Sequence, residues 1–198
     1  MPKTLLAAVI LPVLLLTACQ REETPAVRPV AAPLPSDATS SEILPIEAVP
    51  KSQPGAVAQH VANTEITLTY SRPVARGRQL FGALVPYDEV WNPGADQATA
   101  INFSRNVEIE GQPLPAGKYS IWAIPRPDQW TIIFSRAADV FHIPYPGEDS
   151  DALRVNVRPE RSTHVETLTF EFPVVDGKDA VLRLHWGDVM VSMAVRVP

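Results

Sequence analysis

The sequence predicts an all-β domain, an antiparallel β-sandwich with jelly-roll-like character, and three observations support it. Apolar and polar residues alternate with a period of two in one short segment after another. Turn-forming residues such as Asp176-Gly177 separate these segments. No segment carries the 3.6-residue apolar stripe of an amphipathic helix. An open β-barrel is the alternative architecture for the same pattern.

The expected strands follow one another from about residue 66 to residue 195. Residues 119–124 are apolar at nearly every position, which indicates a central strand buried on both faces. Gly187-Asp188 separates the last two alternating segments and predicts a two-residue type II′ hairpin turn. The remaining segments are Ile66/Leu68/Tyr70, Thr99/Ile101/Phe103, Val107/Ile109, Trp130/Ile132/Phe134, Leu153/Val155/Val157, Leu168/Phe170/Phe172, Leu182/Leu184/Trp186 and Val189/Val191/Met193/Val195.

The N-terminal segment has the features of an export signal. Lys3 precedes an apolar run from Leu5 to Leu16, which is too short to cross roughly 30 Å of hydrocarbon as a helix. The run ends in Leu16-Thr17-Ala18-Cys19, which resembles the lipobox of bacterial lipoproteins, where the cysteine becomes the lipidated first residue. A simple signal peptide cut near Ala18 is the alternative. Because Cys19 is the only cysteine of the chain, we predict a lipoprotein signal over residues 1–18 and acylation, such as palmitoylation, of Cys19.

The residue after the cysteine bears on the cellular location. Gln20 differs from the Asp that resembles an inner-membrane retention signal. In a cell with two membranes, we therefore expect a lipid-anchored protein of the cell envelope, held at the outer membrane and facing the periplasm. The lipid bilayer is then its first partner, through acylated Cys19.

Residues 19–60 are predicted to be a disordered tether rich in Pro and Ala. Each proline lacks a backbone N–H and restricts the residue before it, so the segment has no room for a helix. Its low apolar content cannot offset the entropy of ordering the chain. The prolines concerned are Pro25, Pro29, Pro33, Pro35, Pro45, Pro50 and Pro54. We therefore expect the folded domain to cover residues 61–198.

A series of short motifs runs through the expected domain. In order, they are Tyr70-Ser71-Arg72-Pro73, Arg76-Gly77-Arg78, Leu80-Phe81-Gly82, Val85-Pro86-Tyr87, Val90-Trp91, Gly94-Ala95, Ala98-Thr99, Leu114-Pro115-Ala116-Gly117-Lys118-Tyr119-Ser120, Ile124-Pro125 and Trp130. The series resembles domain-of-unknown-function family 2911, a group of exported bacterial proteins, over roughly residues 65–197. The resemblance supports the fold and the export, and it brings no activity.

Two positions depart from the pattern of that family. The usual Trp-Arg is Trp91-Asn92 in this sequence, and the usual Gly-Ala-Asn-Glu-Ala-Thr is Gly94-Ala95-Asp96-Gln97-Ala98-Thr99. If the Arg and the Glu share a chemical role in the family, this protein performs that role differently or has lost it.

Composition and motifs argue against several classes of function. The formal net charge of −5 disfavours a nucleic-acid partner, since phosphate binding needs a basic face. A single cysteine excludes an intramolecular disulfide framework and a cysteine metal cluster. No Gly-x-Ser-x-Gly or His-Glu-x-x-His motif is present, and the four histidines, His60, His142, His164 and His185, are scattered. The acidic run Glu148–Asp151 is more typical of a solvated loop than of a calcium site. We predict no catalytic residue, metal site or cofactor.

The candidate binding site comprises two loops. Arg72, Arg76 and Arg78 lie within seven residues after the first expected strand, and guanidinium groups bind carboxylate or phosphate in a bidentate way. The second loop, residues 90–99, places an aromatic side chain beside bending residues and small polar groups. If the two loops meet, they form a cleft whose lining would include Tyr87, Trp91, Asn92, Asp96 and Thr99 together with the three arginines. The alternative is structural: the arginines pin the loops by pairing with Asp88, Glu89 or Asp96.

These observations predict a membrane-tethered envelope lipoprotein whose domain has a binding or structural role. The expected ligand is anionic or sugar-like, and the sequence does not identify a protein partner. The alternative function is an enzyme that acts on a glycan or an anionic small molecule in the cleft between Arg72 and Trp91.

Overall fold

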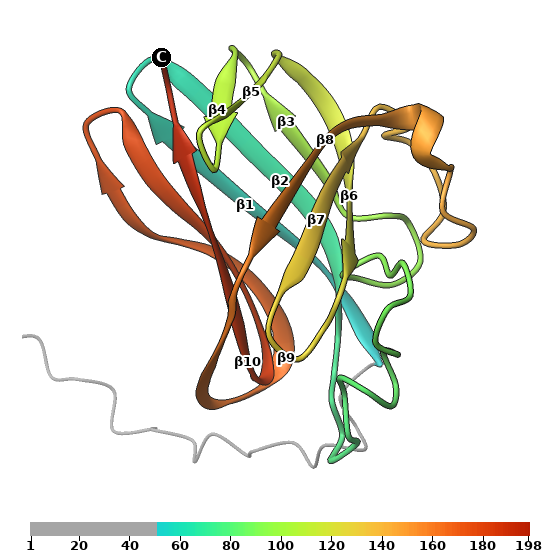
Figure 1. Ribbon diagram of the computed structural model, residues 1–198. Helices are drawn as coiled ribbons and strands as arrows, with labels where there is room; N and C mark the ends of the chain where they lie inside the picture. Colours follow the sequence, from blue (N-terminus) through green and yellow to red (C-terminus); the bar gives the residue numbers. More distant parts are fainter. Residues whose placement is uncertain (1–50) are drawn as a thin grey trace, which may run out of the picture. The chain divides into compact units, whose positions relative to one another are not determined.

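The computed structural model describes residues 51–198, which form two antiparallel sheets packed face to face (Figure 1). The six-stranded sheet has the order β1 (Ser52–Val61), β2 (Thr64–Pro73), β3 (Ala100–Phe103), β6 (Gly117–Ile124), β7 (Trp130–Ser135) and β8 (Asp151–Val157). The four-stranded sheet has the order β5 (Gln112–Leu114), β4 (Val107–Ile109), β10 (Asp179–Arg196) and β9 (Pro159–Asp176). Neither sheet closes on itself, so the predicted sandwich is confirmed and the barrel alternative is wrong.

The core lies between the two sheets and follows the predicted alternation. Ile66 and Leu68 of β2 are fully buried, and so are Leu168 of β9 and Leu182 of β10. A polar contact also joins the sheets, since the Phe170 backbone N–H donates to the Tyr70 hydroxyl at 3.1 Å. The two rings of this pair meet edge to face at 5.0 Å. The two sheets are therefore joined across the core by a hydrogen bond as well as by apolar contacts.

Strand β6 is buried on both faces, as its apolar sequence predicts. All residues from Tyr119 to Ala123 are buried. On the face away from the core, Trp122 packs with Ala98 and Ile133 under Val140 and Tyr145 of the loop before β8. This small second cluster explains why the strand does not alternate.

Strand β1 is a correction to the predicted boundary. We expected a tether up to residue 60, but Ser52–Val61 pairs with β2 along its whole length, so the folded domain begins nine residues earlier. A proline at position 54 is compatible with a strand here because β1 is at the edge of the sheet, where one side of the strand needs no backbone N–H donors. The rest of the predicted tether and the predicted signal lie outside the described residues.

A second correction concerns Gly187-Asp188. The predicted hairpin turn is wrong, because β10 runs continuously through these residues. Its pairing with β9 shifts register on both sides of Gly187, which has φ 59° and forms a bulge. The chain uses the positive φ of this glycine for a bulge in a long strand rather than for a reversal of direction.

Two smaller elements complete the described chain. Strand β5 follows the tight turn at Glu110-Gly111, where both residues have positive φ. A single 3₁₀ turn, Glu148–Ser150, precedes β8. No helix among residues 51–198 is long and apolar enough to span a bilayer.

The bulge at Gly187 yields a test of the packing at this end of the sandwich. A β-carbon at Gly187 would lie 2.7 Å from Leu80 Cδ1, whereas one at Gly177, which also has positive φ, would meet nothing within 4 Å. Gly177→Ala should therefore cost only the left-handed strain, about 1–2 kcal/mol. Gly187→Ala should cost about 1–3 kcal/mol more, because the side chain has to displace Leu80. Denaturant unfolding measures both, and equal losses would contradict the crowding at Leu80.

Candidate functional site

The two predicted loops do meet, around a cavity of about 680 Å³ that we call the Arg–Trp cleft. The Arg loop, residues 72–78, follows β2, and the Trp loop, residues 90–99, precedes β3. Further lining comes from the start of β1, from the turn at 84–85, from the loop before β8 and from β10. The lining residues are Lys51, Ser52, Pro73, Arg76, Arg78, Leu84, Val85, Trp91, Gly94, Ala95, Asp96, His142 and Trp186.

An aromatic cluster fixes Trp91 in the wall of this cleft. Its ring lies nearly parallel to that of Trp186, with centroids 6.0 Å apart and an interplanar angle of 14°. Phe81 and Trp130 approach edge to face at 5.9 and 6.1 Å. The Trp91 backbone also exchanges two hydrogen bonds of 2.8 Å with Ala123 of β6. Trp91 remains half-buried, so the cleft has an aromatic wall that is held on all other sides.

Asn92 and Thr99 close the Trp loop from inside instead of facing the cleft. The buried Asn92 side chain donates to the Ile121 carbonyl at 2.8 Å and accepts from the Thr99 N–H at 3.2 Å. The Thr99 hydroxyl donates to the Pro93 carbonyl at 2.8 Å. A β-carbon at Gly94 would lie 2.6 Å from that hydroxyl, so the loop needs glycine there. Asn92 therefore has a structural role in the Trp loop.

The three arginines have different surroundings. Arg72 is outside the cleft lining and ties β2 to β9, with Nε donating to the Leu168 carbonyl at 3.2 Å and Nη2 to the Thr169 hydroxyl at 3.1 Å. Arg78 lines the cleft while Nε and Nη2 donate to the Ala75 and Val74 carbonyls at 2.8 and 2.7 Å. These bonds use two of its five N–H donors and fix the orientation of the guanidinium.

Arg76 also lines the cleft, from a left-handed backbone position with φ 55°. Its backbone N–H donates to the Glu166 carboxylate. The structural alternative pairs the arginines with Asp88, Glu89 or Asp96. Asp88 pairs with Arg126 instead, and Arg72 and Arg78 donate to backbone carbonyls and to a hydroxyl. The Arg loop is thus held mainly by backbone carbonyls and by Glu166.

Asp96 and His142 both line the cleft and are in contact with each other. The Asp96 carbonyl accepts from the backbone N–H of His142 at 2.9 Å and lies 2.8 Å from its Nδ1. A carbonyl can only accept, so Nδ1 carries a proton, and the neutral ring has its lone pair on Nε2. Nearby in the same lining, the Ser52 hydroxyl is buried and has no hydrogen-bond partner in the described part of the chain.

Tyr87 lies in a neighbouring cavity of about 430 Å³, which we call the His164 cleft. Its ring covers Gly82, where a β-carbon would lie 2.7 Å from Tyr87 Cε2. The His164 cleft is also lined by Arg78, so one guanidinium belongs to both cavities.

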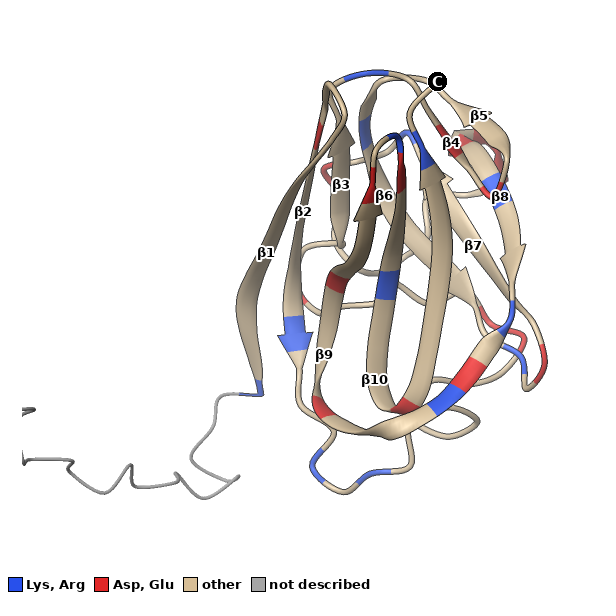
Figure 2. Ribbon diagram, turned by 90° about the vertical axis from the view of Figure 1, so that its left-hand side faces the viewer, with Lys and Arg blue, Asp and Glu red and all other residues tan. Residues whose placement is uncertain are grey.

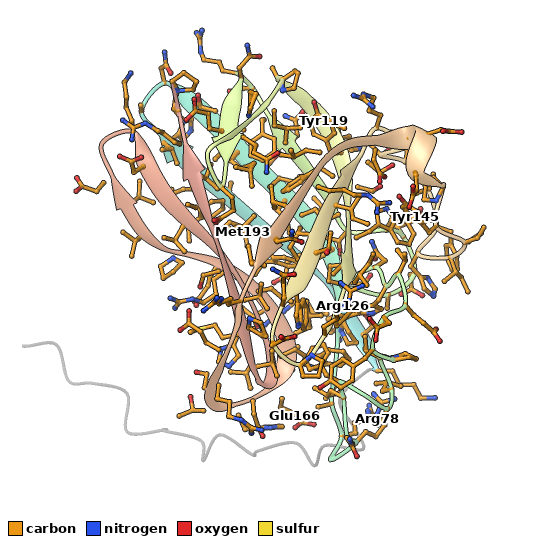
Figure 3. The ribbon with its side chains drawn as sticks, viewed as in Figure 1. Arg78, Tyr119, Arg126, Tyr145, Glu166 and Met193 are labelled. Carbon is orange, nitrogen blue, oxygen red and sulfur yellow. The ribbon has the colours of Figure 1, made fainter. Side chains whose placement is uncertain are left out.

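His164 lies between two carboxylates at the edge of its cleft. Nδ1 is 3.0 Å from Asp188 and Nε2 is 2.9 Å from Glu166. Hydrogen bonds to Glu166 and then Asp188 raise the pKa of His164 above its ordinary value of 6.5. The same contact with His164 lowers the pKa of Glu166 below 4.5, with help from the backbone N–H of Arg76. Figure 3 shows Glu166 and Arg78 at the same end of the sandwich.

The acidic run at 148–151 belongs to a separate polar cluster. Asp151 accepts from Tyr145 and from Arg154, both at 2.6 Å, and Arg154 also pairs with Glu148 at 3.1 Å. Burial and the bond to Asp151 raise the pKa of Tyr145 to about 12. Asp151 is thus engaged within the loop, and within residues 51–198 no three His, Cys, Asp or Glu side chains are grouped to hold a metal ion.

The sequence missed several cleft residues. Lys51 and Ser52 were assigned to the tether, and Trp186 was predicted only as a core residue. Pairing of β9 with β10 brings Glu166, Asp188 and Trp186 together. The predicted turn at Gly187 does not allow this pairing, because it ends the strand there. Apolar alternation around Trp186 was visible, but no local signal connects it to Trp91.

Comparison with known proteins places the domain in one family. Residues 52–195 match the model of a family described as "Protein of unknown function (DUF2911)". No curated protein and no solved structure matches the chain.

The His164 network predicts a measurable titration. His164 should titrate above 6.5, and Glu166→Gln or Asp188→Asn should each lower that pKa by removing a carboxylate acceptor. Protonated His164 makes charged contacts that stabilise the fold fully when the pH is below the pKa of His164 in the unfolded chain. This stabilisation is lost as the pH rises through the raised pKa of His164 in the folded protein. The charged contacts of Glu166 are present above 4.5 and are lost as the pH falls through its lowered value. NMR of the imidazole protons measures the pKa of His164. Glu160→Gln, which changes a carboxylate with no hydrogen bond to His164, is the control and should leave it unchanged.

Proposed function

The chain belongs to the DUF2911 family, whose description names no function, and we propose that it is an envelope lipoprotein whose domain binds a small anionic ligand in the Arg–Trp cleft. The observation that carries this proposal is the meeting of the Arg loop and the Trp loop around one cavity of about 680 Å³. Its volume is within the range of small-molecule sites, roughly 300–1,000 Å³.

The charges of the lining favour an anion. Lys51, Arg76 and Arg78 contribute positive charge, whereas Asp96 is the single carboxylate. Arg78 is oriented before any ligand arrives, because two of its donors are bound to carbonyls of its own loop. A fixed guanidinium loses less conformational entropy on binding than a mobile one, and it offers the bidentate geometry that carboxylate and phosphate accept.

The aromatic wall favours a ligand with a flat or apolar part. Trp91 is held by the stacked Trp186 and by its backbone bonds to Ala123, so little reorganisation is needed to receive a ring. Ser52 also belongs to this lining, and its buried hydroxyl has no hydrogen-bond partner among the described residues. A sugar or another ring that carries a phosphate or carboxylate combines these requirements.

Binding is favoured over catalysis in the same cleft. His142 has a lone pair on Nε2 when neutral, which suits a general base, and Ser52 supplies a hydroxyl. These two groups are not hydrogen-bonded to each other, because the Ser52 hydroxyl has no hydrogen-bond partner within residues 51–198. Turnover of a nitrophenyl ester that His142→Gln abolishes would favour the enzymatic alternative.

The proposed location follows from the N-terminal sequence. Leu16-Thr17-Ala18-Cys19 supports a lipid anchor, and Gln20 supports sorting to an outer membrane with the domain facing the periplasm. Two or more acyl chains, at about 0.8 kcal/mol per buried methylene, would anchor the protein durably.

The cleft proposal predicts that a ring and a charge bind better together than apart. Phenyl phosphate should raise the melting temperature of the purified full chain, whereas inorganic phosphate and phenol should have smaller effects at equal concentration. Arg78→Gln should weaken phenyl phosphate binding about tenfold, the equivalent of one charge-assisted hydrogen bond. Calorimetric titration gives the dissociation constants.

Arg126→Gln is the matched control, because Arg126 is a half-exposed arginine that pairs with Asp88 outside the cleft lining. It should bind phenyl phosphate like the wild type. Trp91→Phe keeps a ring in the aromatic cluster and separates loss of the wall from loss of the fold. No shift with phenyl phosphate, or equal binding by the Arg78→Gln protein, would overturn the proposal.

The anchor proposal predicts that Cys19 carries lipid. Cells grown with a clickable fatty acid should label the wild-type protein, and Cys19→Ala should abolish the label because it removes the only thiol of the chain. Fluorescence after gel separation is the readout. Equal labelling of the two proteins, or no labelling of either, would refute the anchor.

A further inference from the structure

Exposed apolar side chains gather at the rims of the two clefts. Among residues 51–198, five of the seven exposed large hydrophobic residues lie in two loop segments, 84–90 and 141–143. Leu84 lines the Arg–Trp cleft itself and is 44% exposed, and Phe141 and Ile143, at 48% and 63%, flank the lining residue His142. Exposed apolar side chains that gather on one side of a binding site indicate a partner that covers them.

The fold brings these segments to one rim. The backbone N–H of Ala98 donates to the Val140 carbonyl at 2.9 Å, and that of His142 donates to Asp96 at the same distance. Gln97 and Phe141 form a β-bridge between these bonds. The loop that carries Phe141 and Ile143 is therefore fastened to the Trp loop, beside the cleft.

The positive charge of the cleft lies next to this apolar rim. Lys51 and Arg78 line the same cavity as Leu84, so a ligand that reaches both has an anionic group next to an apolar one. An anionic lipid has this arrangement, with a phosphate at the polar end of its acyl chains. A free phosphate or sugar phosphate has no acyl chain that could cover the exposed Leu84 and Ile143.

The point where the chain enters the domain supports the same ligand. Lys51 and Ser52 line the cleft, and the proposed anchor, Cys19, lies N-terminal to them in the chain. Figure 2 shows basic segments both at this entry and in the loop after β2, at one end of the domain. A lipid anchor at Cys19 would be joined to the domain at this end of the domain.

We infer that the ligand of the Arg–Trp cleft is the headgroup of an anionic membrane lipid. Arg78 and Lys51 bind its phosphate, and Leu84, Phe141 and Ile143 contact the upper part of its acyl chains. The inference rests on the proposed anion-binding function of the cleft and names the class of ligand.

Native mass spectrometry of the full chain, released from non-ionic micelles, tests the inference. Three probes are added separately: phosphatidylglycerol, phosphatidylcholine and glycerol 3-phosphate. Phosphatidylglycerol should give a one-to-one adduct with at least tenfold tighter binding than either of the other two. Arg78→Gln and the pair Leu84→Ser with Ile143→Ser should each weaken that adduct about tenfold.

Val174→Ser is the matched control for the apolar change. Val174 is 52% exposed and lies beside the turn between β9 and β10, at the other end of the sandwich from the start of β1 (Figure 1). This variant should retain phosphatidylglycerol like the wild type. Circular dichroism melting of each variant shows that the fold is intact.

The other outcomes separate the two proposals. If glycerol 3-phosphate binds as tightly as phosphatidylglycerol and Leu84→Ser has no effect, the cleft binds a free anion and the lipid inference is overturned. If phosphatidylcholine binds equally well, the charge of the cleft selects nothing and the inference fails as well. If no probe binds, in agreement with an absent phenyl phosphate shift, the proposed function fails together with it.

Discussion

The hydrogen bonds of Glu166 hold together the end of the sandwich on which the candidate site depends. Its carbonyl accepts from the Ala75 N–H at 2.7 Å and from the Trp186 indole at 3.3 Å. Its carboxylate accepts from the Arg76 N–H and bonds to His164 at 2.9 Å. One residue of β9 therefore positions the Arg loop, the inner tryptophan of the stack and the histidine of the second cleft. These bonds add to those of Arg78 in fixing a loop that contains Gly77, a residue with wide backbone freedom.

The Arg loop and the Trp loop divide their residues between two tasks. The side chains of Asn92, Thr99 and Arg72 donate hydrogen bonds to backbone carbonyls and so hold the loops and strands in place. Arg78 and Trp91 are oriented by the fold while part of each side chain still borders the cavity. This division is the usual basis of pre-organisation. The structural residues hold the loops still, so Arg78 and Trp91 lose less conformational entropy when a ligand binds.

The sequence predicted the sandwich and the two loops well, because strand alternation and turn residues are local signals. The sequence offered the meeting of the Arg loop and the Trp loop only as a hypothesis. The cleft also depends on long-range contacts between the two sheets, such as the bridge between Val74, after β2, and Thr167 of β9. Two errors have clear physical causes. Pro54 suggested a tether although an edge strand tolerates it, and Gly187 suggested a turn although its positive φ serves a bulge. Glu166 had no signal at all, since its role arises from neighbours at positions 75, 76, 164 and 186.

The position of Arg78 in the lining of both clefts has a thermodynamic consequence. An anion bound on one side of a guanidinium lowers the positive potential available on the other side, so the two clefts compete for one charge. By linkage, a ligand of the His164 cleft changes the affinity of the Arg–Trp cleft by the same factor as the reverse. If each cleft binds an anion, the two ligands are therefore negatively coupled through the shared cation, without a moving subunit.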